Sequence, residues 1–170
     1  KDVKYEAAYT PLHGRSPCAL LRGLRSPTRI GERAAGMGAS AVGLADVNGL
    51  YGLVRFAAEA GRRGLKALFG VAVYRQDRHL CTLYAKEMGG FARMNEIITR
   101  LLSSEDYDPV PDLLSGGWKG LVPVVRDPET LRRLAEGGGQ PRVLFAGIFY
   151  GYPYETLRQT ARRLGIPLFA

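Results

Sequence analysis

The sequence predicts an α/β fold in which a parallel sheet closes into a barrel. Short apolar segments alternate with amphipathic helical segments along nearly the whole chain. The links between them are short, which favours parallel strands joined by helical crossovers. Six or seven such units are more typical of a barrel than of an open sheet. With 170 residues, 46% of them hydrophobic, we expect residues 1–170 to form a single domain with a substantial core.

The first half of the chain shows the clearest helix signals. Ser26 suits an N-cap, Pro27 the first turn and Gly38 the position just past a helix end, so residues 26–38 are expected to be helical. The expected strands of this half are 9–13, 41–46, 66–75 and 79–86, and the other expected helices are 49–64 and 90–103.

The second half contains an irregular stretch. Residues 104–119 lack periodicity and carry two prolines, which indicates an exposed loop or a partly ordered insert. Because the chain stops inside an apolar segment at Ala170, we expect a fragment of a longer protein that continues after this point. The remaining elements are strands at 120–125 and 142–149, helices at 127–136 and 152–165, and the start of a strand at 166–170.

The charge balance favours acidic partners. There are 24 Lys and Arg against 16 Asp and Glu, a formal net charge of +8, which is compatible with weak nucleic-acid contact. Adjacent arginines at 62–63, 132–133 and 162–163, however, fall late in expected helices, where cations suit the helix dipole. Solvated helix ends are the preferred interpretation of these pairs.

Membrane and disulfide classes are not indicated. No run approaches the roughly 18 apolar residues of a membrane span, and no signal-peptide pattern opens the chain. Cys18 and Cys81 are in no zinc or redox spacing, so we expect reduced thiols packed in the core of a cytoplasmic protein.

Functional side chains of such a barrel gather where its strands end. That rule selects His13–Arg15, Asp46–Asn48, Ala72–Arg75 and the neighbourhood of Arg126. His13 and Asp46 could ligate a metal ion, whereas Arg15 and Val47 lie where further ligands would be needed.

The segments "TPLHGRSPCALLRGLRSPTRIGERAAGMGASAVGLADVNGLYGLVRFAAEAGRRGLKALFGVAVY", "HLCTLYAKEMGGFARMNEIITRLLS" and "LGIPLFA" carry a resemblance over nearly the whole chain. They resemble the PHP (polymerase and histidinol phosphatase) domain, most of all that at the N-terminus of bacterial DNA polymerase III alpha subunits, replicative or error-prone. The resemblance implies a distorted TIM-like (β/α)7 barrel, here expected to be truncated at its C-terminal end. It also implies a cluster of two or three metal ions that hydrolyses phosphoesters, or an inactive structural domain.

The family's metal motifs are only partly present. His13 matches the first histidine of His-x-His, and Asp46 matches the aspartate of the Asp-His pair. The next metal histidine aligns with Leu80, which leaves His79 one residue out of register and, on a regular strand, on the opposite face. A later cysteine ligand falls near Arg126 and Asp127, without the cysteine. Other ligand positions hold Arg15, Arg22, Val47 and Ala72.

Arginine has no lone pair to offer a metal ion, so we predict no catalytic residue, no metal and no cofactor. A buried carboxylate needs a partner. We therefore predict an ion pair between Asp46 and Arg15 or Arg22, within an ion-pair or anion cluster of His13, Arg15, Arg22 and Asp46.

The sequence thus favours a catalytically inactive PHP-like domain in DNA replication or translesion synthesis, with other polymerase domains or subunits as partners. One alternative is a metal-dependent phosphoesterase or 3'-5' exonuclease with a reshaped site. Another is a non-catalytic nucleic-acid-binding module that uses His13, Arg15, Arg22 and Arg25. Tyr150, Tyr152 and Tyr154 could stack on bases, although packing against the barrel is the preferred interpretation.

Overall fold

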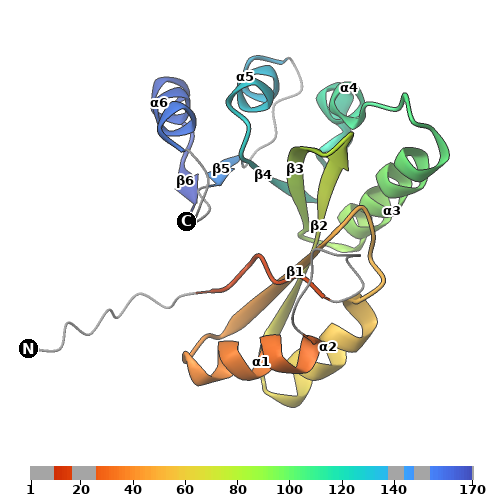
Figure 1. The fold of residues 1–170 in the computed structure, drawn as a ribbon, viewed down its shortest axis with the longest axis vertical. Coiled ribbons are helices and arrows are strands. Elements are labelled where there is room, and N and C mark those ends of the chain that lie inside the picture. Colours follow the sequence, from red (N-terminus) through yellow and green to blue (C-terminus); the bar gives the residue numbers. More distant parts are fainter. Residues whose placement is uncertain (1–9, 17–25, 138–143, 148–153, 170) are drawn as a thin grey trace, which may run out of the picture. The chain divides into compact units, whose positions relative to one another are not determined.

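A computed structural model describes residues 10–16, 26–137, 144–147 and 154–169, which contain both helices and strands (Figure 1). The chain divides into two compact units. The N-terminal unit comprises Lys1–Asp46 and Leu50–Phe69, and the C-terminal unit comprises Val47–Gly49 and Gly70–Ala170. The single domain over residues 1–170 stays a prediction.

The N-terminal unit pairs two helices with a buried strand. The Ser26 hydroxyl accepts a hydrogen bond from the backbone of Arg29, and Pro27 occupies the first turn, so the first helix begins as its sequence predicts. The second helix starts later than expected because Gly49 and Gly52 precede it, and glycine disfavours a helical interior. The two helices pack side by side (Figure 1). The elements are α1 (Pro27–Gly36), β1 (Ala41–Val47), α2 (Leu53–Arg62) and the start of β2 (Lys66–Arg75).

Residues 10–14 run beside β1 without forming a regular strand. The amide of Gly43 donates to the Pro11 carbonyl at 2.8 Å, and the amide of Ala45 donates to the Gly14 carbonyl at 2.8 Å. Gly14 and Leu44 form an isolated parallel bridge. Proline has no N–H to donate, which limits the ladder. The strand expected at 9–13 is therefore replaced by this shorter pairing, and residue 9 lies outside the described part.

The sheet of the C-terminal unit is mixed. β2 and β3 (Arg78–Ala85) form an antiparallel hairpin, and β3 is antiparallel to β4 (Leu121–Val125). Only Gln76 and Asp77 separate β2 from β3, both with positive φ, and two residues cannot make a helical crossover. The expectation of a wholly parallel sheet is wrong here. Parallel pairing holds from β4 to β5 (Phe145–Gly147) and to β6 (Leu168–Phe169).

The segment 104–119 contributes to the core, which corrects the expectation of an exposed loop. Val110 and Leu113 are fully buried, and Trp118 is almost so. The segment folds into a short helix and one π-helical turn. The helical elements of this unit are α3 (Met88–Ser103), α4 (Pro109–Asp112), η1 (Leu113–Gly117), α5 (Pro128–Glu136) and α6 (Glu155–Leu164).

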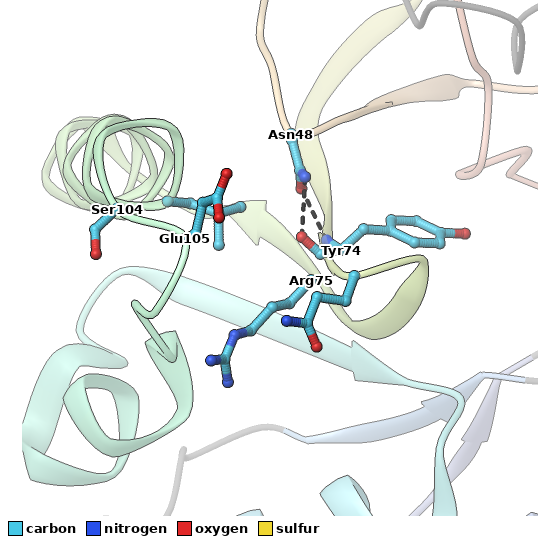
Figure 2. Close-up of a pocket in the computed structure, with 7 residues that line it drawn as sticks. Asn48, Tyr74, Arg75, Ser104 and Glu105 are labelled. Carbon is cyan, nitrogen blue, oxygen red and sulfur yellow. Dashed lines mark hydrogen bonds between the residues drawn. The ribbon is translucent and has the colours of Figure 1, made fainter.

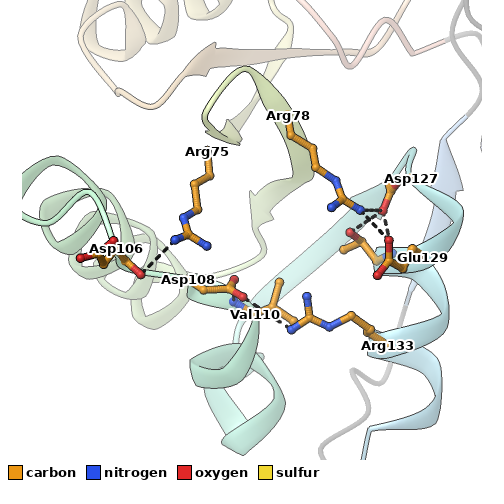
Figure 3. Close-up of polar contacts among 9 residues, drawn as sticks. Arg75, Arg78, Asp106, Asp108, Val110, Asp127, Glu129 and Arg133 are labelled. Carbon is orange, nitrogen blue, oxygen red and sulfur yellow. Dashed lines mark hydrogen bonds and ion pairs between the residues drawn. The ribbon is translucent and has the colours of Figure 1, made fainter.

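Arginines hold the acidic start of this segment in place. Arg75 donates to the backbone carbonyl of Asp106 at 3.3 Å, and Arg133 lies 3.5 Å from the Asp108 carboxylate (Figure 3). Arg100 pairs with Asp112 at 2.6 Å. The three arginines come from β2, α3 and α5, so the segment is tied to three elements of the unit.

Asp127 caps α5 and also pairs with Arg78 at 2.8 Å (Figure 3). The pKa of Asp127 lies below its ordinary value. Partial burial alone would raise this pKa, but hydrogen bonds from the Thr130 hydroxyl, the Thr130 amide and Arg78 outweigh burial and lower it. The charged form is therefore the one that the folded state favours.

The variant Asp127→Asn keeps an N-cap side chain but removes the charge, so it isolates the electrostatic contribution. A lowered folded-state pKa stabilises the protein above the ordinary aspartate pKa of about 3.9, and this stability is lost as the pH falls through the folded-state pKa. We expect wild type to exceed Asp127→Asn in free energy of unfolding at pH 7 and the difference to vanish on acidification. Urea unfolding from pH 7 to pH 2 measures it. A constant difference across this range would contradict the argument.

Candidate functional site

Asp46 lies near the end of β1 and is 1% exposed. Its Oδ1 accepts the backbone amide of Ser16 at 2.6 Å, and its Oδ2 accepts the Ser16 hydroxyl, also at 2.6 Å. Gly52 packs directly against this contact, because a Cβ built on it would lie 2.6 Å from the Ser16 Oγ and 2.8 Å from the Asp46 Oδ2. Both oxygens of this buried carboxylate are thus engaged by one serine in a space without room for a larger residue.

His13 and Arg15 lie together on the segment that pairs with β1. The Arg15 Nη2 lies 3.3 Å from the His13 Nε2. A guanidinium nitrogen can only donate, so the imidazole nitrogen accepts in this contact. The structure brings His13 to Arg15 and Asp46 to Ser16. The ion pair of Asp46 with Arg15 or Arg22 stays a prediction, and Arg22 lies outside the described residues.

Three further positions hold aliphatic side chains. Ala72 is fully buried, Leu80 is 7% exposed, and Val47 is half-buried. None of these side chains can ligate a metal ion. Among the described residues, no group of three or more His, Cys, Asp or Glu side chains is placed to hold a metal.

A β-bulge decides which face His79 occupies. Ala72 pairs with Thr82 and Val73 with Cys81, but the next pair is Tyr74 with His79, which leaves Leu80 as the extra residue of β3. Directly paired residues share a face of the sheet. His79 therefore lies on the same face as Thr82, and their side chains are 3.0 Å apart. The expectation that His79 and Leu80 point to opposite faces assumed a regular strand, whereas the bulge places His79 on the face of Ala72 and Thr82.

Arg126 completes a polar cluster with Tyr74, His79 and Thr82. It follows directly after β4, and its Nε donates to the His79 Nδ1 at 3.2 Å. Its Nη2 donates to the Tyr74 hydroxyl at 2.8 Å. The rings of Tyr74 and His79 meet edge to face, with their centroids 5.0 Å apart. We call these four residues the Arg126 cluster.

A cavity of about 380 Å³ lies elsewhere in the C-terminal unit. The Asn48 side chain donates to the Tyr74 carbonyl at 2.9 Å and accepts the Tyr74 amide at 2.8 Å, so it acts as an extra strand partner at one wall (Figure 2). The Tyr74 ring points away from this cavity (Figure 2). The cavity is lined by Asn48, Tyr74, Arg75, Gln76, Leu101, Ser104 and Glu105.

The described residues do not fit the metal cluster that the resemblance implies. Divalent ions of this kind need several carboxylate and imidazole ligands converging on one point. Both oxygens of Asp46 already accept hydrogen bonds, and the Nε2 of His13 and the Nδ1 of His79 each face an arginine nitrogen.

Sequence reasoning missed Ser16 and Thr82, and it included Tyr74 only within the range Ala72–Arg75. Ser16 directly follows Arg15, which stands at the family's second histidine position, and only the fold shows that its hydroxyl reaches Asp46. Asn48 carried a usable signal, since an asparagine just after a strand often adopts positive φ, and its φ is 46°. Cys81 is free and fully buried, and burial raises the pKa of its thiol to about 12, as suits a packing residue.

The chain is similar to a known domain family and to several known proteins. The PHP domain model matches residues 11–164. An error-prone DNA polymerase of Anaeromyxobacter sp. (strain K) is 30% identical over 98% of this chain and 17% of its own length. One from Corynebacterium efficiens is 32% identical over 84% of this chain and 12% of its own length. The chain thus spans about a sixth of the length of the first of these relatives.

Two solved structures share the fold. An amidohydrolase from Chromobacterium violaceum has a TM-score of 0.55 at 17% identity, covering 94% of this chain and 84% of its own. A protein from Bifidobacterium adolescentis, described as a candidate metal-dependent phosphoesterase, has a TM-score of 0.57 at 13% identity, covering 95% and 86%. These likenesses concern the fold alone and confirm the predicted α/β class of the TIM-like PHP type. The match over residues 11–164 shows that the chain belongs to the PHP domain family.

Proposed function

We propose that this chain is a catalytically inactive PHP domain of a DNA polymerase related to the error-prone DNA polymerases. Its role is structural: it serves as a surface for other polymerase domains or subunits in DNA replication or translesion synthesis. The similarity to error-prone DNA polymerases over 98% of the chain supports this context.

The observation that carries the proposal is the state of Asp46. A metal-ligating carboxylate presents oxygen lone pairs to the ion. Here each oxygen accepts a 2.6 Å hydrogen bond from Ser16, and the side chain is 1% exposed. These contacts satisfy the carboxylate from within the chain.

Hydrolysis assays of the purified chain test the proposal against the phosphoesterase and exonuclease alternatives. The substrates are bis(p-nitrophenyl) phosphate and a 3'-labelled single-stranded DNA, each with added Zn²⁺ or Mn²⁺ and with EDTA. We expect product formation equal to that of a buffer blank with the same metal. Metal-dependent turnover that disappears in Asp46→Ala would overturn the proposal, and the Asp46→Ala control separates turnover by this chain from a contaminating nuclease.

A second candidate function is weak contact with nucleic acid through α5 and α6, which pack side by side (Figure 1). Arg132, Arg162 and Arg163 are exposed, and none makes an ion pair with another described residue. Arg133 and Arg158 on the same helices pair with Asp108 and Glu155. The net charge of +8 favours the same partner.

Binding of fluorescent single-stranded DNA tests this second function. We expect affinity to fall steeply between about 50 and 200 mM salt and the triple variant Arg132→Ala, Arg162→Ala, Arg163→Ala to weaken it further. The matched control, Arg133→Ala with Arg158→Ala, removes arginines whose charge is already paired and should weaken binding less. Equal losses in both variants would point to general charge and exclude this surface.

A further inference from the structure

Arg126 contacts the His79 ring through its Nε. A guanidinium carries N–H groups on all of its nitrogens, and no protein environment deprotonates it. The Arg126 Nε can therefore only donate in its 3.2 Å contact with the His79 Nδ1. It follows that this ring nitrogen has no proton and offers its lone pair to Arg126.

The other ring nitrogen must then carry the proton of the neutral imidazole. The His79 Nε2 lies 3.0 Å from the Thr82 Oγ1, which can accept that proton in a hydrogen bond. Tyr74 fixes the geometry from two sides. Its hydroxyl accepts from the Arg126 Nη2 at 2.8 Å, and its ring meets the imidazole edge to face. Both arginine and histidine are half-buried, so these contacts are partly shielded from competing water.

We propose that Arg126 locks His79 in the neutral tautomer protonated at Nε2, so that neither ring nitrogen has a lone pair available to a metal ion. An imidazole ligates a metal through an unprotonated nitrogen. In this cluster the guanidinium occupies the position next to Nδ1 and adds a fixed positive charge, while a proton occupies Nε2. Arg126 is in this sense a positioning residue that prevents the histidine from ligating a metal ion.

The neighbouring charges are already paired. The Asp127 Oδ2 accepts from the amide and hydroxyl of Thr130 and from Arg78 at 2.7–2.8 Å. Arg78 also contacts Glu129 at 3.1 Å (Figure 3). The carboxylate that follows Arg126 thus caps α5 and binds Arg78.

The inference rests on the proposed inactive role and explains how the histidine next to a former ligand position is withdrawn from metal chemistry. Long-range ¹H–¹⁵N NMR spectra of the uniformly labelled full chain test it directly, because the ring nitrogens of each tautomer have distinct shifts. The chain contains only two histidines, so the variant His13→Gln leaves His79 as the single signal. At neutral pH we expect a protonated-type Nε2 and an unprotonated-type Nδ1.

Variants identify the cause. Arg126→Ala should change the Nδ1 shift and broaden or mix the tautomer pattern, whereas Arg126→Lys, which still donates, should preserve it. Wild-type spectra showing the proton on Nδ1 would overturn the inference, as would an unchanged pattern in a folded Arg126→Ala. If Arg126→Ala does not fold, the wild-type spectrum still decides. Metal-dependent hydrolysis with the tautomer intact would defeat the proposed function alone, so the two failures are distinguishable.

Discussion

Replacing Ser16 by alanine should lower the free energy of unfolding by about 2–3 kcal/mol, because a buried charged group loses one of its hydrogen bonds. The Asp46 carboxylate is 1% exposed, so water cannot replace the lost hydroxyl without opening the structure. Its Oδ2 would be left without the 2.6 Å contact that Ser16 provides. Removing one partner of a buried polar pair costs more than the pair contributes on average.

Urea unfolding followed by circular dichroism measures this effect. Ser16→Thr keeps a hydroxyl and serves as the conservative variant, which should recover most of the loss. Ser115→Ala is the matched control, since its exposed hydroxyl donates to the Asp112 carbonyl at 3.0 Å. That variant should change stability by less than about 0.5 kcal/mol. Equal effects of Ser16→Ala and Ser115→Ala would show that the Ser16–Asp46 contact contributes little.

Gly43→Ala should destabilise the protein by about 3 kcal/mol or more, because its methyl group would clash with the backbone of Leu12. A Cβ at this position would lie 2.3 Å from the Leu12 carbonyl oxygen and 2.8 Å from the Leu12 Cα. The contact lies where the segment carrying His13 and Arg15 pairs with β1. Neither backbone can move without breaking these hydrogen bonds.

Gly61→Ala in α2 is the matched control, since a Cβ there meets nothing within 4 Å. Alanine favours a helix over glycine by roughly 0.5–1 kcal/mol, so this variant should be slightly more stable than wild type. Thermal unfolding of the three proteins gives the comparison. A Gly43→Ala melting temperature within error of wild type would contradict the close packing of Leu12 on β1.

Much of the fold could be predicted because its signals are local. Ser26 and Pro27 begin α1, and Asp127 begins α5, each through a cap that the sequence displays. The antiparallel hairpin was missed because periodicity does not report strand direction. Its signal was the two-residue link Gln76–Asp77, which is too short for a crossover.

The candidate site was less predictable because its contacts join residues far apart in sequence. Thirty positions separate Ser16 from Asp46, and 47 separate His79 from Arg126. The bulge at Leu80 places His79 on the same face of the sheet as Thr82, and no local pattern in "RHLCT" predicts this bulge. Alignment with the family identified the positions, while the partners that replace the metal ligands required the fold.

Within the chain, the Asp46 carboxylate is bound by Ser16 and the His13 ring by Arg15, so we propose that the domain holds no metal cluster. Equilibrium dialysis of the purified full chain against Zn²⁺ and Mn²⁺, followed by elemental analysis, tests this most directly, with Asp46→Ala as the comparison. We predict metal contents far below one equivalent and no difference between the two proteins. One or more equivalents of metal in the wild type, lost in Asp46→Ala, would contradict the account.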